Sequence, residues 1–170
     1  IPANLRNLYD FTMGGFRIRR PMAAVRVSKE NREILNNAYT RVPMDIIELD
    51  TDNLYSGISA EKLTVATSGV YRLHFQLQFV QQTVASPSAM KCWIVKNDSD
   101  LANTETASIA SSTGPVYTAG GGSVCCTTVA LLNKGDALYW VGWHNIGVAA
   151  TVDPSFGGTR AYALWLGPLP

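Results

Sequence analysis

Residues 63–80, LTVATSGVYRLHFQLQFV, carry the most regular pattern in the chain. After the Ser68-Gly69 turn, apolar and polar residues alternate without a break from position 71 to position 79. A helix would scatter those apolar side chains around its surface, whereas a β-strand places them all on one face. That face needs cover, so we expect a second layer of structure opposite this strand. The apolar residues are Tyr71, Leu73, Phe75, Leu77 and Phe79, and the polar ones are Arg72, His74, Gln76 and Gln78.

Short segments with strand-like composition recur on both sides of this stretch, at intervals of about ten residues. Turns separate them, and the tightest is Asn133-Lys134-Gly135-Asp136. The one segment compatible with a helix, residues 29–37, is short and could equally be a polar connection. The pattern therefore predicts an all-β, antiparallel sandwich or barrel of about eight to ten strands. The expected strands are 23–28, 36–41, 44–49, 63–65, 71–79, 90–96, 104–110, 123–132, 137–144 and 159–166.

Two of these segments say more about the surface of the domain. Residues 137–144, ALYWVGWH, are apolar on both strand faces, which predicts cover on both sides. Residues 97–122 would make an unusually long connection without structure, so we expect a strand near 104–110 and an exposed loop. Exposed loops are where binding specificity tends to be found.

Composition excludes several classes of function. A net charge of +1 with 16% charged residues gives no general electrostatic reason to bind nucleic acid or an anionic membrane. The apolar runs are much shorter than the roughly 20 residues of a membrane span, so no membrane insertion is expected. The chain starts at Ile1 without a signal-peptide pattern, and we expect a fragment or a processed product of something longer.

The N-terminal stretch differs from the rest of the chain. Residues 1–22 carry four arginines among leucines and aromatic residues. Basic residues interleaved with aromatic ones can contact nucleic acid, but a Gly-Gly break and a Pro stop favour an arm or linker. Such an arm would dock on the domain, on a partner subunit or on a preceding shaft. We therefore predict an arm at 1–22, a head domain at 23–170 and no nucleic-acid partner. The arginines are Arg6, Arg17, Arg19 and Arg20.

The cysteines and histidines do not form a recognisable site. Cys92, Cys125 and Cys126 are odd in number, two are adjacent, and no Cys-x-x-Cys spacing exists, so we expect small buried hydrophobes. His74 and His144 lie on separate expected strands without ligand spacing. No nucleophile-elbow motif is present. We predict no enzyme activity, no metal and no cofactor, although a ring of three His74 side chains would become possible in a trimer.

Three weaker patterns remain open. Asp50, Asp52 and Asn53 could hold calcium through oxygen ligands, but the spacing is not that of an EF-hand and a solvated turn is the simpler interpretation. Asn97-Asp98-Ser99 matches an N-glycosylation acceptor, which matters only in a eukaryotic secretory pathway. Gly120–Gly122 resembles a phosphate cradle superficially, since no Lys-Ser/Thr follows it.

Three motifs in order resemble a known family. They are Gly69-x-Tyr71 opening a long strand, the Leu-x-x-Gly-Asp turn at 132–136, and a hydrophobic closing strand RAYALWLGPLP at the end. Together they resemble the jelly-roll head of the tumour necrosis factor and complement C1q superfamily, over about residues 23–170. The resemblance implies an antiparallel jelly-roll sandwich of about ten strands that is homotrimeric, with its inner sheet packed around a threefold axis.

This resemblance also implies which residues meet at the axis. The face with Tyr71 would be the core, and the opposite face with Arg72 would point to the axis. Many relatives have a more aromatic axis; a polar one implies hydrogen bonds, water or an ion. If Tyr162, Leu164 and Leu166 fill the core, the alternate residues of the closing strand line the axis, unless the arm covers Trp165. The predicted trimer interface is Arg72, His74, Gln76, Gln78, Cys125, Thr127, Ala161, Ala163 and Trp165.

The polar loops 81–88, 97–122 and 145–158 are expected to meet the ligand. The first functional hypothesis is a non-enzymatic trimeric head of a viral fibre or spike, above all a bacteriophage one, at the virion surface. It would bind a cell-surface receptor, a glycan or another virion protein. Unpaired cysteines and loops rich in Ser, Thr, Ala and Gly favour it by association only. The predicted ligand-binding residues are Ser86, Ser88, Thr113, Tyr117, Asn145, Asp153 and Phe156.

Two alternatives stay open. The same fold could be a secreted, extracellular C1q-like recognition module that binds protein or carbohydrate ligands. Glycosylation at Asn97 or a collagen-like segment upstream would favour it. An enzyme on a jelly-roll scaffold is the third hypothesis, and it would require at least a metal at His74 or His144.

Overall fold

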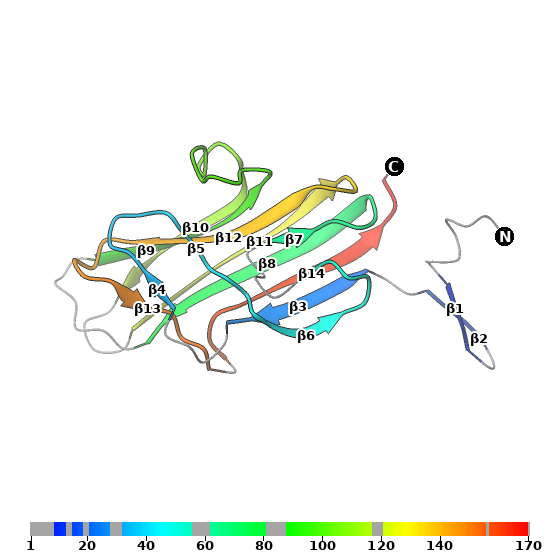
Figure 1. Cartoon of the computed structure of the whole chain (residues 1–170), viewed down its shortest axis with the longest axis horizontal. Helices are drawn as coiled ribbons and strands as arrows, with labels where there is room; N and C mark the ends of the chain where they lie inside the picture. The colour runs from blue at the N-terminus through cyan, green and yellow to red at the C-terminus, as the bar shows by residue number, and fades with distance from the viewer. Residues whose placement is uncertain are drawn as a thin grey trace.

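The computed structural model has two antiparallel β-sheets that face each other, and Figure 1 shows them as the layers of one sandwich. It describes residues 9–12, 15–18, 21–27, 32–55, 62–80, 88–116, 121–155 and 157–169. These residues include no helix, and therefore none long and apolar enough to cross a membrane. The all-β, antiparallel prediction is confirmed.

The strand predicted from residues 63–80 is the middle of one sheet. It forms β8 (Gly69–Phe79), an eleven-residue strand. We call its sheet the β8 sheet. The order of strands across the β8 sheet is β11 (Gly122–Leu132), β8, β14 (Arg160–Gly167), β3 (Met22–Arg26) and β6 (Ile46–Asp50).

The facing sheet is built around β12 (Ala137–His144), and we call it the β12 sheet. β7 (Leu63–Thr64) pairs with β12 outside the main path of this sheet. The order of strands across the β12 sheet is β10 (Ser108–Val116), β9 (Ser88–Lys96), β12 and β5 (Thr40–Arg41).

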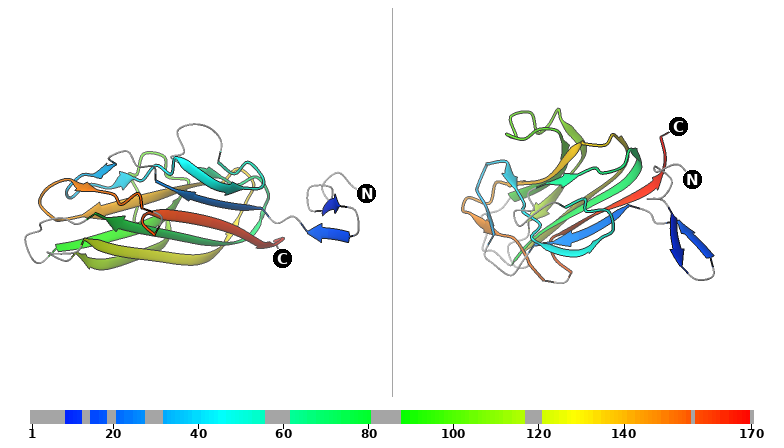
Figure 2. Two further views of the ribbon diagram at one scale, coloured as in Figure 1. Left: turned by 90° about the horizontal axis from the view of Figure 1, so that it is seen from below. Right: turned by 45° about the vertical axis from the view of Figure 1, so that its right-hand side comes forward.

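Two small sheets complete the fold. β4 (Glu33–Ile34) pairs with β13 (Ala150–Thr151), so the helix considered for residues 29–37 does not form over the described part of that segment. β1 (Tyr9–Thr12) pairs with β2 (Gly15–Ile18) in the region predicted as an arm. Figure 2 shows this hairpin outside the two layers of the sandwich.

The core lies between the two large sheets. All five alternating apolar side chains of β8 are at most 2% exposed, as the strand periodicity predicts. Phe75 meets Trp140 of the opposite sheet with ring centroids 5.8 Å apart. The indole N–H of Trp140 donates a hydrogen bond to the Tyr55 hydroxyl, so the one polar atom of this buried side chain is satisfied. Burial raises the pKa of Tyr55, which keeps the phenol neutral.

β12 is covered on both faces, as its sequence predicts. Trp140 and its alternate neighbours face the main core. Tyr139 and Val141 belong instead to a second cluster on the outward side of the sheet, together with Trp93 and Val95 of β9. Leu101 and Ala107 pack against this second cluster, so the segment that leads from β9 to β10 provides the second cover.

The orientation predicted for the closing strand is wrong. Ala161, Ala163 and Trp165 are 2%, 0% and 6% exposed and belong to the core, whereas Leu166 is 40% exposed. The register explains this, because the three buried residues of β14 lie directly opposite Phe75, Leu73 and Tyr71 of β8. Residues opposite each other in a sheet share a face, and large side chains on β8 leave room for alanine on its neighbour.

The long segment 97–122 contains the expected strand, but in a different place. β10 begins at Ser108, whereas the sequence prediction had it near 104–110. Residues 101–106 form turns instead. Asn97 and Leu101 adopt positive φ angles of 58° and 62°, which breaks any extended strand before β10.

Candidate functional site

The outward side of the β8 sheet, which we call the β8 face, carries most of the predicted interface residues. Arg72, His74, Gln76 and Gln78 alternate with the buried residues of β8 and point away from the core. Cys125 and Thr127 lie opposite Gln76 and His74 in the register of β11 with β8, and both are exposed. These six predictions therefore fall on one surface of the chain.

One half of the β8 face is apolar. Three exposed large hydrophobic residues, Val129, Leu131 and Leu166, lie on β11 and β14, the two strands that flank β8. Val129 lies opposite Arg72 and Leu131 opposite Val70, so the apolar side chains of β11 adjoin those of β8. Leu164, on the far side of Arg72, extends the patch toward β3. Val129, Leu131 and Leu166 are 59%, 58% and 40% exposed. Ile47 and Leu49, 46% and 42% exposed, lie on the far edge strand β6, where Ile47 is opposite the buried Val25.

A histidine marks the boundary of this apolar half. The His74 ring stacks on Tyr162 of β14, with centroids 4.8 Å apart and 17° between the planes. Its Nδ1 lies 2.9 Å from the Thr127 hydroxyl on the other neighbouring strand. Burial lowers the pKa of His74, and the positive charges of Arg160 and Arg72 lower it further. The imidazole is therefore held neutral between two arginines.

The opposite half of the β8 face is polar and is tied to a neighbouring loop. The Gln76 amide donates to the Gly157 carbonyl over 2.8 Å, and the Gln78 amide donates to the Asp153 carboxylate over 2.8 Å. Thr159 holds the backbone of Gln78 from both sides, accepting from its N–H and donating to its carbonyl. The side chains of Gln76 and Gln78, which were predicted to form hydrogen bonds at a trimer axis, thus form them within one chain.

Sequence reasoning missed the apolar half of the β8 face. Residues 123–132 are apolar or small on both strand faces near their end, so Val129 and Leu131 could not be told from core residues by alternation alone. The signal that could have found them is the pairing of β11 with β8. The β11 residues opposite the buried residues of β8 share the core face, so the alternate residues of β11, which include Val129 and Leu131, are exposed. Ala161, Ala163 and Trp165 do not join this surface, because they lie in the core.

The predicted ligand-binding residues do not converge on one site. Ser88 is the first residue of β9 and is 9% exposed. The Asn145 side chain accepts a hydrogen bond from the Ala89 N–H over 2.6 Å, which stabilises the end of the β12 sheet. Asp153 orders its own loop by accepting from the Ser155 N–H over 2.8 Å. Thr113 is exposed on the edge strand β10. The remaining three predictions, Ser86, Tyr117 and Phe156, lie outside the described residues.

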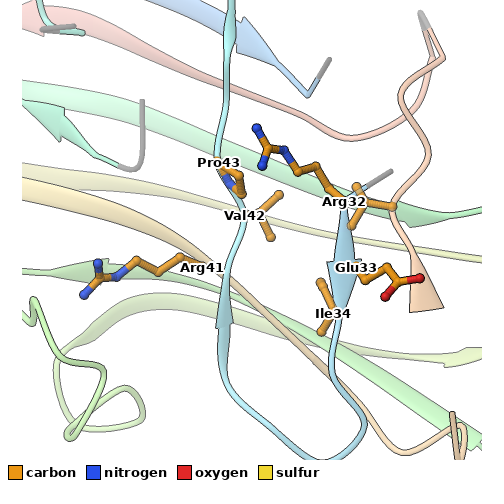
Figure 3. A pocket seen from close by; sticks show the side chains of 7 residues that line it. Arg32, Glu33, Ile34, Arg41, Val42 and Pro43 are labelled. Carbon is orange, nitrogen blue, oxygen red and sulfur yellow. The ribbon is translucent and has the colours of Figure 1, made fainter. Parts of the chain in front are cut away.

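A cavity of about 260 Å³ lies between β4 and the segment 41–43 (Figure 3). Ile34 and Val42 extend toward each other across it, and the Arg41 guanidinium extends away. Arg32 is engaged by Asp45 over 3.3 Å. The Glu33 side chain, on the other side of β4, also extends away from Val42. The charged groups that line this cavity therefore do not converge on one point.

Two side chains considered above as metal ligands, those of Asp50 and His144, form hydrogen bonds within the chain. Among the described residues there is no cluster of three or more His, Cys, Asp or Glu side chains that could hold a metal ion. The Asp50 carboxylate accepts from the backbone N–H groups of Leu54 and Tyr55, each over 2.9 Å, so it orders the following loop. His144 is fully buried, with Nε2 2.7 Å from the Ile34 carbonyl and Nδ1 accepting from Ile146.

Adjacent residues of a strand face opposite sides of the sheet, and Cys125 and Cys126 follow this rule. Cys92 and Cys126 are buried in the main core, and Cys125 is exposed on the β8 face. The expectation of three buried cysteines is therefore wrong for Cys125. The neighbouring Cys126 side chain raises the pKa of the Cys92 thiol, and burial raises it further, so Cys92 remains a protonated thiol.

Comparison with known proteins identifies the fold. No family model and no curated protein sequence matches the chain. A crystal structure of murine APRIL at pH 5.0 does match, with a TM-score of 0.62 and 14% sequence identity over 87% of this chain and 100% of that one. The fold is a tumour necrosis factor-like jelly roll. At this identity the jelly-roll likeness establishes architecture alone. It confirms the fold implied by the motifs at Gly69, at 132–136 and in the closing strand.

Proposed function

We propose that the chain is a homotrimeric, receptor-binding head whose subunits associate through the β8 face. The observation that carries this proposal is the gathering of three exposed large hydrophobic residues, Val129, Leu131 and Leu166, on the two strands that flank β8. A contiguous apolar patch of this kind more often marks an interface than a free surface. The tumour necrosis factor-like fold supports the same placement, because the family resemblance implies that this sheet surrounds a threefold axis.

The composition of the β8 face favours a close contact in its apolar half. Val129, Leu131 and Leu166 lose water on association without leaving a polar group unsatisfied. The neutral imidazole of His74 adds no charge to be desolvated. Arg72 is the single charged side chain amid the apolar residues of β8 and its neighbours, and it would contact a partner subunit or remain at the solvent rim.

We further propose that the head is displayed on a viral fibre or spike at the virion surface and is not an enzyme. The thiols support this setting, since Cys92 and Cys126 lie within hydrogen-bonding reach of each other in the core, unbridged, and Cys125 is exposed. Exposed and unbridged thiols suit a protein that folds in a reducing cytoplasm, where particles can be assembled.

The alternative of a secreted, glycosylated module has less support. Asn97 heads the acceptor pattern, but its side chain is occupied on both sides. The amide donates to the Asp136 carboxylate over 2.9 Å, and the amide oxygen accepts from the Ala137 N–H over 2.8 Å. A glycan on Asn97 would disrupt the turn that these two bonds hold together.

The first test is the solution mass of the purified chain by light scattering, at micromolar concentration and after serial dilution. The expected result is the mass of three 18.4 kDa chains, retained on dilution. A single-chain mass at every concentration would overturn the trimer. The display role is tested separately: the purified trimer should compete with the particle that carries it for attachment to host cells, and attachment unaffected by a saturating amount of trimer would overturn that role.

A further inference from the structure

A cavity of about 260 Å³ lies on the outward side of the β12 sheet, over β9 and β10. The strand register places Ser111 opposite Trp93 and Thr113 opposite Lys91, so hydroxyl groups of one strand adjoin an indole and an ammonium of the next. Glu105, from the turn before β10, completes the rim. The volume is just below the roughly 300–1,000 Å³ of drug-sized sites, which suits one small polar ring.

One aromatic side chain, Trp93, lines this cavity, and two others lie next to its lining residues. Trp143 of β12 lies opposite Lys91 in the register, and the Lys91 ammonium is 5.3 Å from the Trp143 ring and 5.9 Å from the Trp93 ring. Tyr39 packs its edge against Trp93, with centroids 5.3 Å apart and 71° between the planes. Trp93 is therefore a fixed support, and Tyr39, 42% exposed, presents aromatic surface to solvent.

The cavity offers unused hydrogen-bonding groups. Within the described part of the chain, the Lys91 ammonium and the hydroxyls of Ser111 and Thr113 form no side-chain hydrogen bond. The Glu105 carboxylate accepts from the Tyr39 hydroxyl over 2.9 Å through one oxygen, and its other oxygen remains available. A donor cation, an acceptor carboxylate and two hydroxyls that can do either thus face one small space.

A second cavity, of about 250 Å³, adjoins the first and shares Glu105 with it. Tyr39, whose hydroxyl donates to Glu105, also lines this second cavity, and the turn 102–106 provides the remaining lining. The Glu105 side chain therefore stands between two spaces of nearly equal size. Two linked rings could occupy them, one against Lys91 and the other against the Tyr39 ring.

The loop that carries Glu105 is held in place before any ligand arrives. Asp98, which is buried, accepts from the Asn103 N–H over 3.0 Å, and the Ala107 N–H donates to the Asn103 carbonyl over 2.7 Å. The Ser108 hydroxyl donates to the Glu105 carbonyl over 3.0 Å. Ordering of the binding groups beforehand reduces the entropy lost when a ligand binds.

We propose that these two cavities form a saccharide-binding site with two subsites. Sugars combine hydroxyl groups, which need a mixture of donors and acceptors, with apolar C–H faces, which pack on aromatic rings. The first subsite supplies Lys91, Glu105, Ser111 and Thr113 as hydrogen-bonding groups, and the second supplies the exposed ring of Tyr39. The chemistry selects a polyhydroxylated ring over a flat aromatic ligand in the first subsite, because the lining there is predominantly polar.

This inference deepens the proposed function, on which it rests for its biological setting, by naming the ligand class of the head. The site itself needs only one subunit, because every residue named above belongs to one chain. It also lies on the outward side of the β12 sheet, away from the β8 face. Saccharide binding and trimer formation can therefore be measured independently on the same samples.

The experiment screens the full chain against a panel of neutral, N-acetylated and acidic mono- and disaccharides by saturation-transfer NMR, followed by titration of the hits. The variants are Glu105→Gln, Lys91→Met and Tyr39→Ala. We expect Glu105→Gln, which keeps the shape of the side chain, to weaken binding at least tenfold. Tyr39→Ala should weaken disaccharides about tenfold and monosaccharides by less. Lys134→Met, which removes an exposed lysine from the turn after β11, is the control and should leave affinity unchanged.

Each outcome has a clear meaning. The site is supported if Glu105→Gln weakens saccharide binding and Lys134→Met does not. If Lys91→Met loses the binding of acidic sugars alone, the first subsite holds a sugar carboxylate. A folded chain that binds no member of the panel at millimolar concentration, or binding that all three variants leave intact, overturns it. The solution mass of the same samples separates the two proposals, since a trimer without saccharide binding refutes only the site and a saccharide-binding monomer refutes only the trimer.

Discussion

The indole of Trp165 fills the space over Gly69, so a β-carbon at position 69 would collide with the ring and with the Gly167 carbonyl. This contact explains why the long strand β8 starts with glycine and why the closing strand can bury a tryptophan at the end of the sandwich. The indole N–H of Trp165 also donates to the Ser68 carbonyl over 3.3 Å, which ties the turn before β8 to β14.

Gly69→Ala should destabilise the fold by about 1–3 kcal/mol, because an extra methyl in a filled space forces the indole or the backbone to move. The measurement is the urea midpoint of unfolding followed by tryptophan fluorescence. Gly167→Ala is the control, since a β-carbon there meets nothing within 4 Å. Equal midpoints for the two variants would contradict the assigned packing.

Val129→Asp should break the assembly and leave the subunit folded. Val129 is 59% exposed on the β8 face, so an aspartate costs little in one subunit but would be buried without a partner in each interface. An uncompensated buried charge costs about 3–5 kcal/mol, which corresponds to a rise of at least about 100-fold in the dissociation constant. Sedimentation equilibrium measures it.

The chain provides a matched control for this substitution. Val148 is also a valine and is 57% exposed, but it lies in the loop after β12. Val148→Asp should leave the mass unchanged. If both variants dissociate equally, or neither does, the β8 face is not the interface.

Acidification should destabilise the fold below about pH 6.5, the ordinary pKa of histidine. Burial, followed by the charges of Arg160 and Arg72, lowers the pKa of His74, and burial also lowers the pKa of His144. Since both folded-state values lie below the unfolded one, the unfolded chain binds protons first as the pH falls. The stability present above pH 6.5 is therefore lost progressively toward the folded-state pKa values, as urea midpoints between pH 7.5 and pH 5 would show.

Arg160→Gln separates the two histidines. The variant removes one of the charges that lower the pKa of His74, so the pKa of His74 should rise toward its ordinary value. The pKa of His144 should stay unchanged, because its shift has no contribution from a neighbouring charge. NMR titration of the two imidazole ring protons distinguishes them, and a parallel shift of both would refute the electrostatic assignment.

The three thiols should react at different rates. Cys125 is exposed in one chain, whereas Cys92 and Cys126 are buried. Labelling with a maleimide should modify one thiol of the native Val129→Asp variant and three after unfolding in urea. In the assembled wild type, Cys125 should react more slowly, because it shares the β8 face with Val129. Fast labelling of all three thiols in the folded chain would contradict the burial of the pair.

The sequence predicted the parts of the fold in which alternation is unambiguous. Strand β8 separates apolar from polar residues completely, and residues 137–144 are apolar on both faces, so both assignments followed from the pattern. β14 could not be oriented in the same way, because both alternating sets of RAYALWL contain apolar residues. The buried set consists of the residues that fit beside Phe75 and Leu73, which only the register reveals.

The candidate sites were predictable to a smaller extent. The polar half of the β8 face followed from β8 itself, but its apolar half depends on which side of β11 remains exposed after pairing. The β12-sheet cavities depend on contacts between segments far apart in sequence, such as Lys91 with Trp143 and Tyr39 with Glu105. Thr113, predicted as a ligand contact in the loop 97–122, lies on a strand at the rim of the first cavity, so its region was indicated although its structure was not.

β10 is an edge strand, and two of the residues that it contributes to the first cavity, Ser111 and Thr113, point away from the sandwich. Ser111 and Thr113 can therefore change without repacking the interior, and so can the exposed residues of the turn 102–106. Mutations in the proposed saccharide site would thus have little effect on folding. A lineage of such proteins could keep the β8 sheet nearly constant while this edge diversifies.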